Sequence, residues 1–133
     1  MALPQQHSTS DHNPSVLLVD DDVGALSALA DILSMEGYDV STATNGREAL
    51  DYLRHSPSPR LIILDLVMPV MDGWQFLNAK KNDPNFSRLP VVVVSALDSD
   101  VDARAVIRKP VDVEQLLTLV NMLVGDSRDA TPV

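Results

Sequence analysis

The sequence predicts an α/β fold in which helices cover both faces of a doubly wound, five-stranded parallel sheet. Residues 16–19, 61–64 and 91–94 are short apolar runs, each continuous rather than alternating. A strand that is buried on both faces has this appearance, as in a parallel sheet covered by helices. Helical patterns fill the gaps between the runs, and repeated strand–helix crossovers produce this architecture.

Two further strands complete the predicted sheet. Residues 38–43 alternate between apolar and polar side chains, which suits a half-exposed strand at one edge. Residues 105–107 form a shorter candidate for the opposite edge. With these two strands outermost, we expect the flavodoxin-like order 2-1-3-4-5. Ligands of such sheets bind at the carboxyl ends of the strands, where the winding reverses.

Helices are predicted in the gaps and after the last strand. A glycine that follows the final apolar position ends the first helix at Gly37 and the last helix at Gly125. The first helix is centred on residues 26–33, and the others cover about residues 46–55, 73–81 and 112–124.

Composition predicts one folded domain, residues 15–125, between two disordered tails. Residues 1–14 and 126–133 contain too few apolar side chains to offset the entropy of ordering. The chain has a net charge of −9 and no basic patch, which argues against direct binding of nucleic acid. It contains no apolar run of membrane-spanning length. It has no cysteine, so disulfides and thiolate zinc sites are excluded, and we expect a cytoplasmic protein.

Polar residues follow four of the predicted strands. They are Asp20 to Asp22 after the first strand, Asp65 after the third, Ser95 after the fourth and Lys109 after the fifth. Parallel strands end at one rim of the sheet, so these side chains are expected to share a pocket. Crowded carboxylates repel one another unless a cation lies between them, and hard oxygen ligands suit Mg²⁺. One carboxylate could then act as a nucleophile toward phosphorus, with the lysine neutralising the phosphoryl oxygens.

Four motifs resemble the signatures of the response-regulator receiver family of two-component phosphorelays. They are VLLVDDD at residues 16–22, LDLVMPVMDG at 64–73, VSA at 94–96 and RKP at 108–110. The resemblance covers about residues 15–125. Each residue alone has a simpler interpretation, such as a helix cap, a turn residue or a surface lysine. Four matches at four strand ends favour the functional interpretation.

The resemblance implies a role for each residue of the pocket. Asp65 is implied to be the phosphoacceptor. Asp21, Asp65 and the backbone carbonyl of Val67 would bind Mg²⁺ directly, and Asp20 would act through a coordinated water. Ser95, the backbone N–H of Ala96 and Lys109 would contact the phosphoryl group, and the bond before Pro110 would be cis.

The resemblance also implies the partners. The phosphoryl donor would be a histidine kinase or a phosphotransfer protein, and the signal would pass to an unknown protein by a conformational change. The receiver could form a homodimer. It would not be an enzyme in the usual sense, because self-phosphorylation and slow dephosphorylation would be its only reactions.

Two features depart from the family pattern. Only 14 positions separate Ser95 from Lys109, about eight fewer than usual, or roughly two turns of helix. We therefore expect the fourth helix, between the fourth and fifth strands, to be truncated or irregular. Val106 occupies the position of the usual switch aromatic, so we expect output through another surface, formed by the first and last helices.

Three alternatives have different sequence requirements. A phosphate-independent docking module would suit the shortened fourth helix but not a complete acidic pocket. A haloacid-dehalogenase-type phosphatase needs an Asp-x-Asp-x-Thr pattern after the first strand, and the sequence supplies no such threonine. A nucleotide-binding protein needs a glycine-rich loop after a strand, and none is present.

Overall fold

The computed structural model describes residues 13–98 and 100–129. Residues 1–12 and 130–133, which make up most of the two predicted tails, lie outside this part. For these residues the predicted disorder stays a prediction. Within the described part, no helix has both the length and the apolar character needed to cross a membrane.

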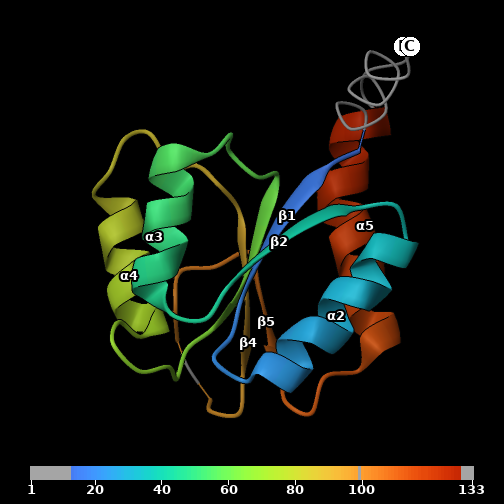
Figure 1. Cartoon of the computed structure of the whole chain (residues 1–133). Coiled ribbons are helices and arrows are strands. Elements are labelled where there is room, and N and C mark those ends of the chain that lie inside the picture. The colour runs from blue at the N-terminus through green and yellow to red at the C-terminus, as the bar shows by residue number, and fades with distance from the viewer. Residues whose placement is uncertain (1–12, 99, 130–133) are drawn as a thin grey trace.

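Five parallel strands form one sheet in the order β2-β1-β3-β4-β5 (Figure 1). They are β1 (Ser15–Val19), β2 (Asp39–Ala43), β3 (Leu61–Asp65), β4 (Val91–Ser95) and β5 (Ala105–Arg108). Val19 at the end of β1 is in register with Ala43 on one side and Leu64 on the other. The predicted fold class and strand order are confirmed, and the carboxyl ends of the strands form one rim.

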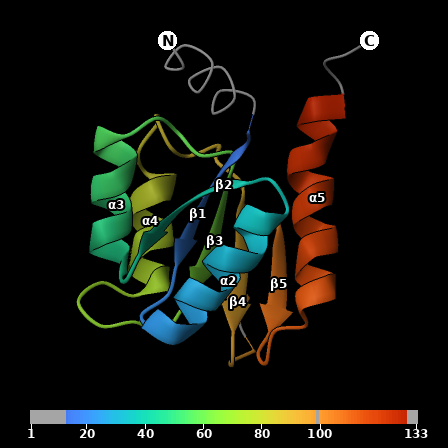
Figure 2. The ribbon, with the colours of Figure 1, turned by 45° about the vertical axis from the view of Figure 1, so that its right-hand side comes forward.

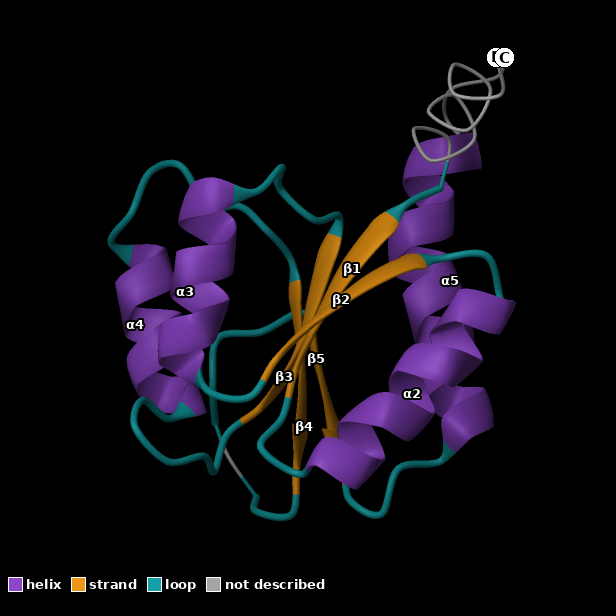
Figure 3. Ribbon diagram, viewed as in Figure 1, coloured by secondary structure: helices purple, strands orange, loops and turns teal. Residues whose placement is uncertain are grey.

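Four helices cover the sheet: α2 (Val23–Met35), α3 (Gly46–His55), α4 (Gly73–Lys81) and α5 (Val113–Asp129). Figure 2 and Figure 3 show α2 and α5 on one face and α3 and α4 on the other. The strands β1, β3 and β4 contribute buried side chains to the apolar clusters on both faces. This double burial explains why their sequences are continuous apolar runs.

The starts of the helices follow from local capping. Asp22, Asn45 and Asp72 precede α2, α3 and α4, and each side chain accepts a hydrogen bond from a backbone N–H in the first turn. The predicted end of the last helix was wrong, because α5 continues past Gly125 to Asp129. A glycine inside a helix costs only about 1 kcal/mol relative to alanine, so it need not end one.

The connection between β4 and β5 is irregular. No helix occurs in its described residues, 96–98 and 100–104, which agrees with the expectation of a truncated or irregular segment there. The helix labelled α4 lies earlier, between β3 and β4, and is the third predicted helix. Val101 and Ala103 of the connection pack against the same apolar cluster as α3 and α4. These two side chains therefore cover part of the sheet face that carries α3 and α4.

Candidate functional site

Three carboxylates gather at the carboxyl rim of the sheet. Asp20 and Asp65 are buried, with 8% and 6% of their surface exposed, whereas Asp21 is exposed. One carboxylate oxygen from each of the three lies within 4.8 Å of the others. Two hydrogen bonds position Asp20. Its backbone N–H donates to the Ala43 carbonyl, and its side chain accepts from the Asp22 N–H. The cluster is therefore built by the ends of β1 and β3.

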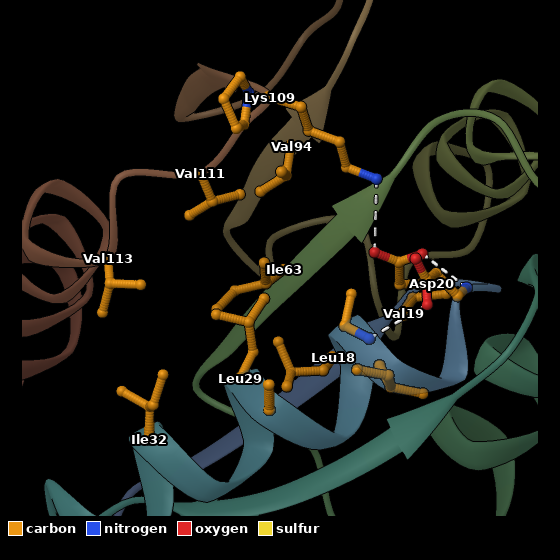
Figure 4. A pocket seen from close by; sticks show the side chains of 15 residues that line it. Leu18, Val19, Asp20, Leu29, Ile32, Ile63, Val94, Lys109, Val111 and Val113 are labelled. Carbon is orange, nitrogen blue, oxygen red and sulfur yellow. Dashed lines mark hydrogen bonds and ion pairs between the residues drawn. The ribbon is translucent and has the colours of Figure 1, made fainter.

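Lys109 supplies the cation of this rim. Its Nζ lies 3.3 Å from Oδ2 of Asp65 and 3.5 Å from Oδ2 of Asp20. Figure 4 shows the lysine side chain reaching from the segment after β5 toward Asp20. The Lys109 backbone N–H donates to the Ser95 carbonyl, and the Lys109–Pro110 bond is cis. The pairing with Asp20 had not been predicted from the sequence.

The electrostatics of the rim favour a charged lysine and work against a charged Asp65. Burial raises the pKa of Asp65, the Lys109 charge opposes that rise, and repulsion from Asp20 adds to it. Burial by itself would lower the pKa of Lys109. The two neighbouring carboxylates outweigh burial and raise that pKa instead. Lys109 therefore keeps its proton, and Asp65 is a carboxylate that would gain from a second cation.

Ser95 is fully buried at the end of β4, and the next residue, Ala96, is exposed. The Ser95 Oγ accepts a hydrogen bond from the Leu97 N–H at 3.0 Å. This bond links the hydroxyl at the rim to the irregular β4–β5 connection. A movement of Ser95 would therefore displace Leu97 at the start of that connection.

The loop from β3 to α4 frames the other side of the rim. Val67, whose backbone carbonyl was predicted as a ligand, is exposed in this loop. Val70 has a φ of 68°, which is strained for a β-branched residue. A Cβ on Gly73 would come within 2.7 Å of the Asp65 carbonyl oxygen. Gly73 therefore allows α4 to start directly against the end of β3.

The structure brings Asp20, Asp21, Asp65 and Lys109 together, as the sequence indicated. The fourth strand end, Ser95, lies on the same rim. Asp22, in contrast, serves as the cap of α2. His55 contacts the Asp51 carbonyl, and His7 and His12 lie outside the described residues. The donor set of three carboxylates fits a hard divalent cation such as Mg²⁺.

Comparison with known proteins gives one consistent result. The family model described as the response regulator receiver domain matches residues 16–121. Response regulator Rre1 of Synechocystis is 37% identical over 120 residues, which cover 84% of this chain and 52% of Rre1. Protein PilH of Pseudomonas aeruginosa is 31% identical over 118 residues, which cover 83% of this chain and 97% of PilH. The chain thus spans about half of one relative and nearly all of the other.

Solved structures agree with these sequence matches. Chemotaxis response regulator CheY4 of Vibrio cholerae superposes with a TM-score of 0.76 at 29% identity, covering 84% of this chain and 98% of CheY4. A signal receiver domain of a histidine kinase from Syntrophus aciditrophicus gives a TM-score of 0.80 at 28% identity, covering 90% and 96% of the two chains.

Proposed function

This chain belongs to the response regulator receiver domain family of two-component signalling, and we propose that Asp65 is its phosphoacceptor. One observation carries the proposal. The buried Asp65 carboxylate lies at the end of β3 beside an ammonium group and two further carboxylates. An acceptor needs a positioned carboxylate oxygen and a cation to neutralise the incoming phosphoryl oxygens, and this rim offers both.

Mg²⁺ is the cofactor that fits the rim. Asp21, Asp65 and the carbonyl of Val67 would bind it directly, and Asp20 would act through a coordinated water. When bound, Mg²⁺ supplies positive charge that lowers the mutual repulsion of the carboxylates and draws the phosphoryl oxygens toward Asp65. The burial that raises the pKa of Asp65 makes such a cation favourable there.

The transfer itself forms one bond and breaks one bond. A carboxylate oxygen of Asp65 attacks phosphorus, and the bond from phosphorus to the donor's histidine nitrogen breaks. The electron pair stays on that nitrogen, which takes a proton from solvent. Later attack of water on phosphorus releases inorganic phosphate and restores the carboxylate. Lys109 would exchange its contact with Asp65 for one with a phosphoryl oxygen.

Ser95 and Ala96 would hold the phosphoryl group from the side of β4. The Ser95 hydroxyl already accepts from the Leu97 N–H and still has its own proton to donate. Donation of that proton to a phosphoryl oxygen would reposition Ser95 and pull on the connection that starts at Leu97. The backbone N–H of Ala96 would add a second donor.

The partners of the domain, residues 15–125, are part of the same proposal. A histidine kinase or a phosphotransfer protein would supply the phosphoryl group in the cytoplasm, and an unidentified protein, or a second copy in a homodimer, would receive the signal. Val106 provides no aromatic ring to turn inward, and the β4–β5 connection has no described helix to present. Output would therefore run through α2 and α5.

The proposal is tested by incubating the chain with Mg²⁺ and acetyl phosphate and measuring its intact mass. We expect a gain of one phosphoryl group that requires Mg²⁺ and is lost in Asp65→Asn. Asp51→Asn is the matched control, because Asp51 is an exposed aspartate on α3, and it should gain the same mass. If the folded chain gains no mass from acetyl phosphate or from a phosphorylated histidine kinase, the proposal fails. A phosphate-independent docking module would then be favoured.

A further inference from the structure

A hollow of about 320 Å³ lies beside the rim, between α2 and the segment that leads from β5 into α5. Figure 4 shows Leu29 and Ile32 of α2 facing Val111 and Val113 across this space. These four side chains are only half-buried. The bottom of the hollow is formed by buried residues of the sheet, among them Ile63. We call this space the apolar hollow.

The apolar hollow results from how the two helices pack. α2 packs mainly on β2 and β1, whereas α5 packs on β3, so the two helices on this face leave space between them. On the α2 side the hollow is lined by the small residues Ala25 and Ala28. Its size and its mainly apolar lining with a few polar groups are typical of small-molecule sites.

The polar groups of the hollow define which molecule fits. The charged residues in the lining are Asp20, Asp22 and Lys109, and Figure 4 shows Lys109 reaching toward Asp20 on one side of the hollow. The ammonium of Lys109 and a carboxylate oxygen of Asp20 are 3.5 Å apart. An anionic group placed here would meet two carboxylates, and a cationic group would meet the lysine. A hydroxyl, in contrast, can accept from Lys109 and donate to Asp20 at the same time.

We propose that the apolar hollow binds a small, uncharged, mainly apolar molecule that carries one hydrogen-bonding group, of the class of an aromatic alcohol. The apolar body lies between α2 and Val111–Val113, and the polar group meets Lys109 and Asp20. The polar end of the hollow shares Lys109 and Asp20 with the proposed phosphoryl site, but binding in the hollow needs neither Mg²⁺ nor a phosphodonor.

The test uses 2-naphthol as the probe and methyl-resolved NMR of the unphosphorylated chain without Mg²⁺. We expect saturable shifts at the methyl groups of Leu29, Ile32, Val111 and Val113. Ala28→Leu fills the hollow from α2 and should weaken binding about tenfold or more, because the added side chain occupies the space of the probe. Ala25→Leu is a second blocking variant, so the test does not depend on the folding of one protein.

Ser27→Leu is the matched control, because it places the same new side chain on an exposed position of α2 outside the lining. It should bind 2-naphthol like the unchanged chain. The proposal is overturned if the unchanged chain shows no saturable shifts, or if Ala28→Leu and Ser27→Leu bind alike. Shifts that follow protein concentration instead of probe concentration would mark a second copy in the hollow and would also overturn it. The phosphorylation test reads mass, so the two proposals fail independently.

Discussion

Lys109 and Lys80 lie at opposite ends of the sheet, and both side chains are removed from bulk water to different degrees. Lys109 follows β5 at the carboxyl end, where its Nζ is within 3.5 Å of two carboxylates. Lys80 is 7% exposed near the end of α4, and its Nζ donates to the Ser87 carbonyl at 3.1 Å. Ser87 precedes β4, so Lys80 lies at the amino end of the sheet.

The pKa of the lysine is shifted in opposite directions at the two ends of the sheet. At the amino end, burial outweighs the attraction of Asp102 and lowers the pKa of Lys80. At the carboxyl end burial acts in the same direction, but the carboxylates of Asp20 and Asp65 overcome it and raise the pKa of Lys109. Lys109 is thus compensated by two carboxylates at the rim where we propose that phosphoryl transfer occurs. A lysine held by a carbonyl is part of the packing.

The largest expected effect comes from removing the compensated charge with Lys109→Met. Breaking a buried ion pair from one side costs about 3–5 kcal/mol, and the partial exposure of Lys109 reduces this, so we expect a loss of about 2 kcal/mol in the free energy of unfolding at pH 7. The loss should shrink as the pH falls, because Asp65, whose pKa burial raises, becomes protonated and no longer needs the cation. Urea denaturation at pH 7 and pH 5 measures both effects.

Lys109→Arg is the control for charge, since it keeps a cation near the two carboxylates. It should lose much less stability than Lys109→Met. If the two variants were equally unstable at both pH values, packing of the stem would explain the loss, and the contrast between the two ends would be wrong.

Much of the fold and of the acidic rim could be predicted from the sequence. The strands were evident because side chains buried on both faces make unbroken apolar runs. The acidic rim followed, because the carboxyl ends of parallel strands meet at one edge. The pairing of Lys109 with Asp20 could not be predicted, since it depends on how far a long side chain reaches from the edge strand to β1.

The burial of Lys80 was missed, although a signal was present. Gly73, Phe76 and Lys80 recur at helical spacing, and all three are buried, so the lysine continues the apolar stripe of α4. No comparable signal in the sequence indicated that the β4–β5 connection packs on the sheet. Val101 and Ala103 pack on the sheet without regular secondary structure, and no periodic pattern reveals such contacts.

A smaller effect of opposite sign is expected from Asp65→Asn. Burial and Asp20 raise the pKa of Asp65 in the folded chain above its ordinary value of 3.8. Ionisation therefore costs folding free energy at pH 7 and costs nothing below the ordinary value. We expect the amide to stabilise the chain by about 1 kcal/mol at pH 7 without divalent cations. The gain should disappear as the pH falls through the folded pKa toward 3.8.

Thermal unfolding of Asp65→Asn beside Asp51→Asn measures this gain. Asp51 is exposed, so its variant should unfold like the unchanged chain. A destabilised Asp65→Asn at pH 7 would mean that the contact with Lys109 outweighs the burial of the carboxylate. Lys109 and Asp65 would then form an ion pair that stabilises the fold.

The smallest effect is expected at the amino end, from Lys80→Met. Loss of the hydrogen bond to Ser87 costs about 1 kcal/mol, but Ser87 is exposed and water can replace the donor. Burial disfavours the charged lysine in the folded chain, and removing this unfavourable term more than offsets the remaining loss of the hydrogen bond. We therefore expect a net gain of about 0.5 kcal/mol in the free energy of unfolding at pH 7. The gain should fade as the pH rises from the lowered folded pKa past 10.5, above which the lysine of the unchanged chain is neutral in both states.

Lys81→Met is the matched control for this variant, because Lys81 is the exposed neighbour on the same helix. Urea denaturation at pH 7 and pH 10 gives the stabilities, and acetyl phosphate labelling should be unchanged in both variants. A loss of more than about 1 kcal/mol in Lys80→Met would exceed an ordinary hydrogen bond. It would show that Lys80 is compensated as strongly as Lys109, and the distinction between the two ends of the sheet would not hold.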